Sequence, residues 1–212
     1  MPRRRNSRTS GVSQRSVFLN VPFDRPYERL FIAFVAGLTV LGLRPRCLLE
    51  IAERGEGRLQ RLLTLLRGSR SSIHDLSRVQ TSLIAGRRVP RFNMPFELGQ
   101  AVMLREFQPH DVHVFESTRH RLAQSVSDLG GIDPLIHGGN PTLISRRLLG
   151  AFAPERRIPS LAEIETVRLE LSRVARRYKR EYGTDTIFEA DGFRVLTAAA
   201  SDISAELGLI AR

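Results

Sequence analysis

The first half of the chain alternates short apolar runs with segments of helical length, and this alternation constrains the fold more than any other feature. Apolar runs that end in turn residues, as buried strands do, occupy residues 16–23, 43–51, 71–77 and 111–117. Apolar residues at helical spacing fill the segments between them, at residues 24–42, 56–70 and 94–107. Strands that alternate with helices in this way predict a parallel, doubly wound α/β sheet.

From about Arg119 onward the pattern becomes helical. Residues 119–153 are typical of two short helices around a Gly-rich loop, and Ser160 with Glu163 forms a capping box that opens a long helix. We therefore divide the chain into a basic tail expected to be disordered (1–15), an α/β domain (16–117) and a helical C-terminal region (118–212).

The long helix after Ser160 carries a stripe of apolar residues at spacings of three and four, and such a stripe must be covered. Its members are Leu161, Ile164, Val167, Leu171 and Val174. Two interpretations stay open: the stripe packs on the chain's own sheet domain, or it makes a homo-oligomer through the C-terminal helices.

Composition limits the kinds of partner and compartment. The chain has 33 Lys+Arg against 22 Asp+Glu, and a basic balance favours anionic partners such as nucleotide phosphates or nucleic acid. Cys47 is the single cysteine, which excludes an internal disulfide and fits a reducing compartment. No apolar run approaches the ~20 residues of a membrane helix, and the basic N-terminus lacks the apolar stretch of a secretory signal. We expect a cytoplasmic protein without a membrane partner.

Polar and charged residues gather where the predicted strands end. In doubly wound sheets, ligands bind in the crevice at the carboxyl ends of the strands. The residues that fall near this crevice are Asn20, Asp24, Tyr27, Arg44, Arg46, His74, Asp75, Arg78, Arg91, Asn93 and Glu97. Several also have a structural interpretation: Asp75 can close a turn, Asn93 can cap the next helix, and His74 can be a buried histidine with satisfied hydrogen bonds.

Glu97 stands in the apolar stretch "RFNMPFELGQA" of residues 91–101. An acidic side chain near a helix start interacts favourably with the helix dipole, by roughly 0.3–1 kcal/mol, which is one interpretation. The alternative is a reactive carboxylate, because Phe92, Met94 and Phe96 surround it and Gly99 lets a ligand approach closely. If Asp75 faces the same crevice, two carboxylates in different environments can divide nucleophilic and acid/base roles.

Common motifs of other enzyme classes do not occur in this sequence. It contains no Walker A loop, no G-x-G-x-x-G and no G-x-S-x-G, so kinases, dinucleotide reductases and hydrolases of those types lack their motifs. The histidines are scattered, and no pair has the spacing of a metal site. We expect no metal.

Four stretches resemble a bacterial family of TIR-like, nucleoside 2-deoxyribosyltransferase-like proteins: VFLNVPFDRPYERLF, RPRCLLEI, SSIHDLSRV and RFNMPFELGQAV. The resemblance covers about residues 16–117 and implies a flavodoxin-like fold. It also implies Glu97 as the catalytic residue, attacking or stabilising the anomeric carbon while an N-glycosidic bond breaks, with Asp75 assisting. Members act on deoxynucleosides or on NAD, some of them in antiphage defence. The compact Asp-x-Gly-x-x-x-Glu spacing of the deoxyribosyltransferases is absent, since 21 residues separate Asp75 from Glu97.

The resulting hypothesis is a nucleotide N-glycosidase, first of all an NAD+ nucleosidase that cleaves between nicotinamide and ribose, with the nucleotide as substrate and no cofactor. The ribose or base would meet Asn20, Asp24 and Tyr27, and the phosphates would meet Arg46, Arg78 and Arg91. One alternative is a non-catalytic nucleotide-binding sensor that signals through its C-terminal helices. Nucleic-acid binding through the arginines of the N-terminal tail is a weaker alternative.

Overall fold

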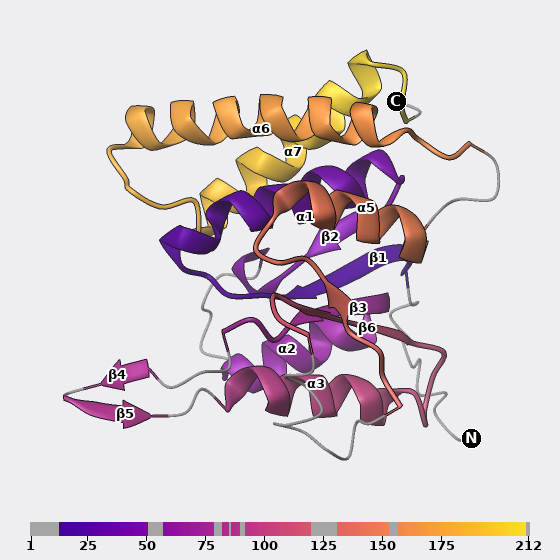
Figure 1. The fold of residues 1–212 in the computed structure, drawn as a ribbon, viewed down its shortest axis with the longest axis vertical. Helices are drawn as coiled ribbons and strands as arrows, with labels where there is room; N and C mark the ends of the chain where they lie inside the picture. The colour runs from indigo at the N-terminus through magenta and orange to yellow at the C-terminus, as the bar shows by residue number, and fades with distance from the viewer. Residues whose placement is uncertain are drawn as a thin grey trace, which may run out of the picture.

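Five parallel strands form the central sheet, in the order β2-β1-β3-β6-β7 (Figure 1). The computed structural model describes residues 13–50, 57–78, 82–84, 86–89, 92–119, 131–152 and 157–210. The strands of the sheet are β1 (Ser13–Asn20), β2 (Arg44–Arg46), β3 (Ser69–Asp75), β6 (Asp111–Glu116) and β7 (Leu135–Ile136). Counted in chain order they follow the sequence 2-1-3-4-5, which is the flavodoxin-like arrangement. The predicted α/β fold is confirmed.

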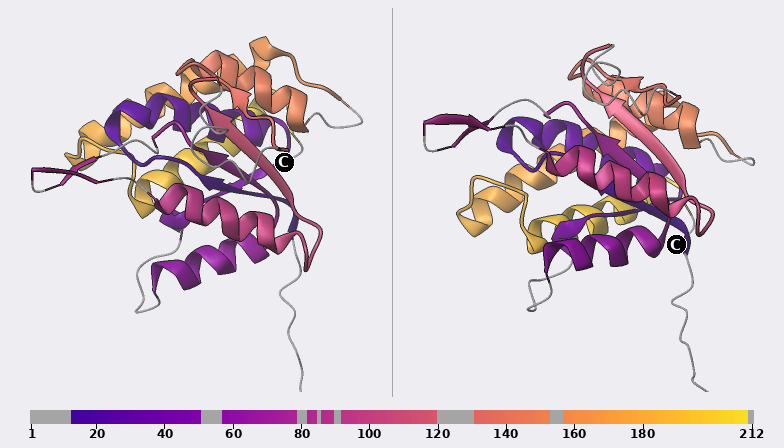
Figure 2. Two further views of the ribbon diagram at one scale, coloured as in Figure 1. Left: turned by 60° about the horizontal axis from the view of Figure 1, so that its bottom comes forward. Right: turned by 90° about the horizontal axis from the view of Figure 1, so that it is seen from below.

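Helices cover both faces of this sheet, and two more form an outer layer (Figures 1 and 2). One face carries α1 (Glu28–Val40) and α5 (Pro141–Phe152), and the other carries α2 (Arg58–Arg67) and α3 (Asn93–Leu104). The outer layer consists of α6 (Leu161–Tyr182) and α7 (Ala190–Glu206), which pack on α1. The short 3-10 helices η1 (Arg25–Tyr27) and η2 (Leu48–Glu50) follow β1 and β2.

Helix α1 lies between the sheet and the outer layer, and its sequence fits this position. Twelve of its 13 residues are buried, as expected of a helix that is apolar on all sides. Gly37 gives the neighbouring helices room, because a Cβ there would lie 2.6 Å from Leu148 Cδ1 of α5 and 3.8 Å from Ile164 Cγ2 of α6. The largest hydrophobic core of the described residues is built around this helix.

The apolar stripe of α6 is covered within the chain. Ile164, Val167 and Leu171 are fully buried in the core that contains α1. The predicted capping box of Ser160 and Glu163 is present at the start of the helix. Self-association is therefore not needed to cover the stripe, and a homo-oligomer through these helices stays a prediction.

The outer layer is also tied to α1 by a polar contact. Lys179 Nζ donates to Glu28 Oε2 at 2.7 Å, and the backbone N–H of Ile187 donates to Glu28 Oε1 at 3.2 Å. The start of α1 thus meets α6 and the segment that leads into α7.

The sheet extends further along the chain in both directions than the sequence pattern indicates. β1 begins at Ser13, so residues 13–15 belong to a strand instead of the tail. β7 pairs with β6 beyond the expected domain limit at residue 117, and α5 covers it, so the sheet domain continues into the C-terminal region. The polar segment between β3 and α3, to which the sequence pattern assigns neither strand nor helix, contains an antiparallel hairpin of β4 (Ser82–Ile84) and β5 (Arg87–Val89) that projects from the body (Figures 1 and 2).

Some expectations fall outside the described residues. They concern the tail at residues 1–12, most of the first of the two short helices expected after residue 119, and Arg91.

Among the helices that the structure describes, none has the length and apolar character of a membrane span.

Candidate active site

The predicted site residues form two clusters on opposite faces of the sheet, because successive residues of a strand point to opposite faces. Asn20 and His74 point to the face covered by α2 and α3, where Phe18 also lies. Asp75 points to the face covered by α1, where it accepts a hydrogen bond from Tyr27. Among the described residues, the carboxyl groups of Asp75 and Glu97 therefore make no contact. The hypothesis that both face one crevice gains no support from them.

Glu97 lies on α3 and is 4% exposed. Its Oε1 accepts a hydrogen bond from Arg58 Nη1 at 2.8 Å, so the first residue of α2 holds the carboxyl group from the solvent side. Its Oε2 is buried and makes no hydrogen bond of regular geometry in the described part of the chain, although the Asn20 amide interacts with the Glu97 carboxyl group. A buried, unpartnered oxygen is costly, since leaving a buried polar group unsatisfied costs about 1–3 kcal/mol. Such an oxygen calls for an explanation, and a substrate contact is one.

Burial raises the pKa of Glu97, while the charge of Arg58 and the Asn20 amide act in the opposite direction. Glu97 is the fifth residue of α3, beyond the first turn, and no acidic residue occupies that first turn. The helix-dipole interpretation therefore loses its basis, because the effect is confined to the first turn. Glu97 is a buried carboxyl group whose surroundings perturb its protonation, as at many functional sites.

A chain of hydrogen bonds fixes the Asn20 amide beside Glu97. Asn20 Nδ2 can only donate, so His74 Nδ1 at 3.0 Å accepts and the His74 proton lies on Nε2. That nitrogen meets Ser72 Oγ at 3.0 Å, and the same hydroxyl meets His110 Nε2 at 2.8 Å. The far nitrogen of His110 reaches the backbone oxygen of Ser69 at 3.1 Å. Burial and, secondarily, His110 lower the pKa of His74 to about 3, so it is a neutral positioning residue for Asn20.

Asp75 is the centre of the second cluster. Its oxygens accept from the Tyr27 hydroxyl, from the backbone N–H of Ser77 at 2.8 Å and from His137 Nε2 at 3.0 Å. Burial first, and then Asp75, raise the pKa of Tyr27, which keeps its hydroxyl protonated as the donor. The backbone N–H of Gly139 donates to His137 Nδ1 at 3.0 Å, so the His137 proton lies on Nε2, facing Asp75.

This second cluster is not a nucleophile triad. In a Ser-His-Asp triad the serine and the aspartate occupy different ring nitrogens, whereas Ser77 Oγ lies 3.0 Å from the same His137 Nε2 that faces Asp75. What the cluster does is join the start of α1, the end of β3 and the loop between β7 and α5 through fully buried side chains.

Asp24 lies apart from Glu97, whereas Asn93 lies one turn before Glu97 on α3. Asp24 caps η1 through the backbone N–H of Tyr27 at 3.1 Å and lies 3.5 Å from Arg78 Nη2, which supports its structural interpretation. Asn93 is the exposed first residue of α3, and the N-cap is Phe92, so Asn93 does not cap this helix.

Arg46 does not face Glu97 either. Glu50 holds its guanidinium with two contacts of 2.9 Å, and Arg44 reaches the same carboxylate at 3.2 Å. Arg46 also approaches Gly68, at the end of α2 opposite to Arg58. Since α2 has ten residues, those two ends are roughly 15 Å apart.

Two contacts were not predictable from local pattern. Arg58 is the first residue of an amphipathic helix, and nothing in the sequence around it indicates a contact with Glu97. His137 lies in a Gly-rich segment that is remote from β3 in the sequence. Only the packing of α2 beside α3, and of the β7–α5 loop beside β3, brings them to the carboxyl edge.

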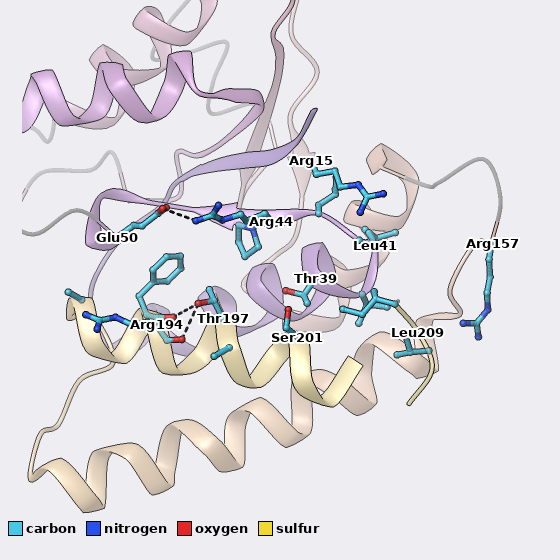
Figure 3. Close-up of a pocket in the computed structure, with 18 residues that line it drawn as sticks. Arg15, Thr39, Leu41, Arg44, Glu50, Arg157, Arg194, Thr197, Ser201 and Leu209 are labelled. Carbon is cyan, nitrogen blue, oxygen red and sulfur yellow. Dashed lines mark hydrogen bonds and ion pairs between the residues drawn. The ribbon is translucent and has the colours of Figure 1, made fainter. Parts of the chain in front are cut away.

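A cavity with a volume of about 1030 Å³ lies away from Glu97. It is a groove between the edge strand β2 and α7, next to the end of α1 (Figure 3). Its floor offers the hydroxyl groups of Thr39, Thr197 and Ser201. Its lining includes Arg15, Arg44, Arg157 and Arg194. A second cavity of about 430 Å³ lies between β6, β7 and α5. The case for Glu97 therefore rests on its burial and on Oε2, which makes no regular hydrogen bond among the described residues.

Comparison of the chain with protein-family models, curated proteins and solved structures finds no match. The family resemblance of the sequence motifs thus remains a hypothesis. Among the described residues, no group of three or more His, Cys, Asp or Glu is arranged to hold a metal ion.

Proposed function

We propose that the protein cleaves the N-glycosidic bond of a nucleotide, with NAD+ as the first candidate substrate and release of nicotinamide by water. The observation that carries the proposal is the buried Oε2 of Glu97, which makes no hydrogen bond of regular geometry among the described residues. Glu97 also lies at the carboxyl edge of a doubly wound sheet, where ligands bind in folds of this class.

The chemistry needs a carboxylate at that place. When the bond between base and ribose breaks, positive charge develops at C1′, and a preorganised negative charge beside it stabilises the transition state or forms a transient ester. Arg58 bonds to Oε1 and leaves Oε2 as the oxygen for the sugar. The Asn20 amide, held by His74, supplies a hydrogen-bonding group next to the same carboxyl group.

The proposal gives the chemical role to Glu97 alone. Asp75 is occupied by Tyr27, His137 and the backbone of Ser77 on the other face of the sheet. We assign Asp75 to positioning the β3 end and the β7–α5 loop, instead of to contact with the ribose. Arg46 and Asp24 are likewise assigned to structural contacts.

A specific observation favours a second candidate function, a nucleotide-binding sensor that signals through the C-terminal helices. The groove of about 1030 Å³ has the size of a ligand site, and α7 forms one of its walls (Figure 3). Arg15 is exposed and lines this groove, where its charge would favour an anion. A ligand in the groove would contact both the sheet edge and the outer helical layer.

One experiment separates the two functions. Purified protein is incubated with NAD+ and with a panel of nucleosides and nucleotides, released base is quantified by chromatography, and binding is measured by calorimetry. Base release that Ala198→Trp leaves intact supports the glycosidase, because Trp at position 198 fills only the groove. Stoichiometric binding without consumption, abolished by Ala198→Trp, supports the sensor and overturns the glycosidase.

A further inference from the structure

The outer face of α3 carries an exposed apolar stripe. Phe92 is 70% exposed, Phe96 53%, Met103 57% and Phe107 75%. Phe92, Phe96, Gly99 and Met103 are spaced by four, three and four residues and so share one face of the helix, while Phe107 lies in the turn that follows the end of α3 at Leu104. The opposite face, with Leu98 and Ala101, is buried against the sheet and α2. Of the nine large apolar side chains that the described residues expose, these four lie within residues 92–107.

We propose that this stripe binds the same stripe of a second copy of the chain, forming a symmetric dimer through α3. The pattern is self-complementary about Gly99. In an antiparallel crossing centred between residues 99 and 100, Phe96 of one copy faces Met103 of the other, and Phe92 lies toward the turn that carries Phe107. Gly99 is exposed, and a Cβ at that position would meet no atom within 4 Å, so two helices can approach closely at the crossing point. A closed two-fold contact uses the same patch on both copies.

The exposed area suits a dimer. With about 200 Å² for a fully exposed large side chain, the four residues present about 500 Å² of apolar surface. Two copies together then bury about 1,000 Å², the lower end of what a specific interface needs. Exposed apolar area of about 500 Å² is comparable to the largest patch on a typical monomer, and such patches are often functional.

The dimer is independent of the glycosidase proposal. Glu97 lies on the buried side of α3 and the stripe on the exposed side, so the contact does not require a substrate. The net charge of +11 makes two copies repel at long range. That repulsion is screened beyond about 8 Å at 0.15 M salt. Self-association should therefore be measured at that ionic strength or above.

Sedimentation equilibrium of the full chain from low micromolar to several hundred micromolar tests the dimer. Phe107→Asp and Met103→Asp should each raise the dissociation constant about 30-fold or more, because each substitution enters the interface twice. Leu169→Asp is the matched control, since Leu169 is 52% exposed on α6, and it should leave association unchanged. Unaltered melting temperatures show that the variants fold. A wild-type protein that stays monomeric over this range overturns the proposal.

Cross-linking tests the two-fold axis itself. Cys47 is buried and burial raises its pKa to about 12, so Gly99→Cys introduces the one reactive thiol of the chain. Two copies related by an axis at residue 99 bring these thiols within disulfide distance. Rapid formation of a covalent dimer by Gly99→Cys, and not by Tyr182→Cys, is the expected result. Equal rates for both variants would show random collision and overturn the assignment of the axis.

Discussion

Acidification should destabilise this protein through His74. The imidazole is fully buried between Asn20 and Ser72, and burial together with His110 lowers its pKa from 6.5 to about 3. Between these two values the unfolded chain binds a proton that the folded chain does not, so the contribution of His74 is intact above pH 6.5 and is lost as the pH falls. Each pH unit below 6.5 costs about 1.4 kcal/mol. From about pH 7.5 to pH 5.0, His74 alone removes about 2 kcal/mol of the free energy of unfolding.

Urea unfolding at several pH values measures this loss. His110 and His113 also have lowered pKa values because they are buried, and they add to the acid sensitivity of the wild type. The variant His74→Gln isolates the one residue, since Gln is neutral at every pH and can still accept from Asn20 and donate to Ser72. Between about pH 7.5 and pH 5.0 the variant should lose about 2 kcal/mol less than the wild type. Equal losses in the two proteins would refute a buried, neutral His74.

Three further predictions use the same geometry. Tyr27→Phe removes a donor from buried Asp75 and should lower the free energy of unfolding by about 1–3 kcal/mol in urea titration, whereas Tyr182→Phe, at a residue that is 64% exposed, should not. Gly192→Ala places a Cβ 2.5 Å from the backbone oxygen of Ile187, so it should lower the melting temperature and reduce the free energy of unfolding by about 1–3 kcal/mol. Gly150→Ala is the control, because a Cβ there meets nothing within 4 Å, and it should be neutral or stabilising by up to about 1 kcal/mol. Arg58→Gln removes the charge that lowers the pKa of Glu97, so any base release should require a higher pH than in the wild type, as measured by its rate against pH.

The sequence predicts the sheet because each long strand has its own run of apolar residues, and each helix between the strands has apolar residues at helical spacing. β7 is missed because Leu135 and Ile136 make a two-residue strand, too short for any period. The hairpin is missed because its second strand reads Arg87-Arg88-Val89, a composition typical of a loop. Its turn does contain Gly86 at φ +78°, a conformation that glycine adopts readily.

The candidate site is predicted in part for a similar reason. Strand ends are visible in the sequence, so Asn20, His74 and Asp75 can be assigned to one edge of the sheet. The register of β1 against β3, in which Asn20 pairs with His74, decides that these two side chains lie side by side on one face, and the sequence does not give that register. Arg58 and His137 reach the edge only through tertiary packing, and no local pattern encodes such contacts.

The most direct test of the central claim is the rate of nicotinamide release from NAD+ by wild type and by Glu97→Gln, with Glu106→Gln on the exposed end of the same helix region as control. Gln keeps the size of the side chain but removes the negative charge that would face C1′, so the rate should fall about 10²-fold or more while NAD+ affinity is retained. The control should match the wild type. Base release at equal rates by wild type and Glu97→Gln, or no base release by the wild type from any nucleotide tested, would contradict the account.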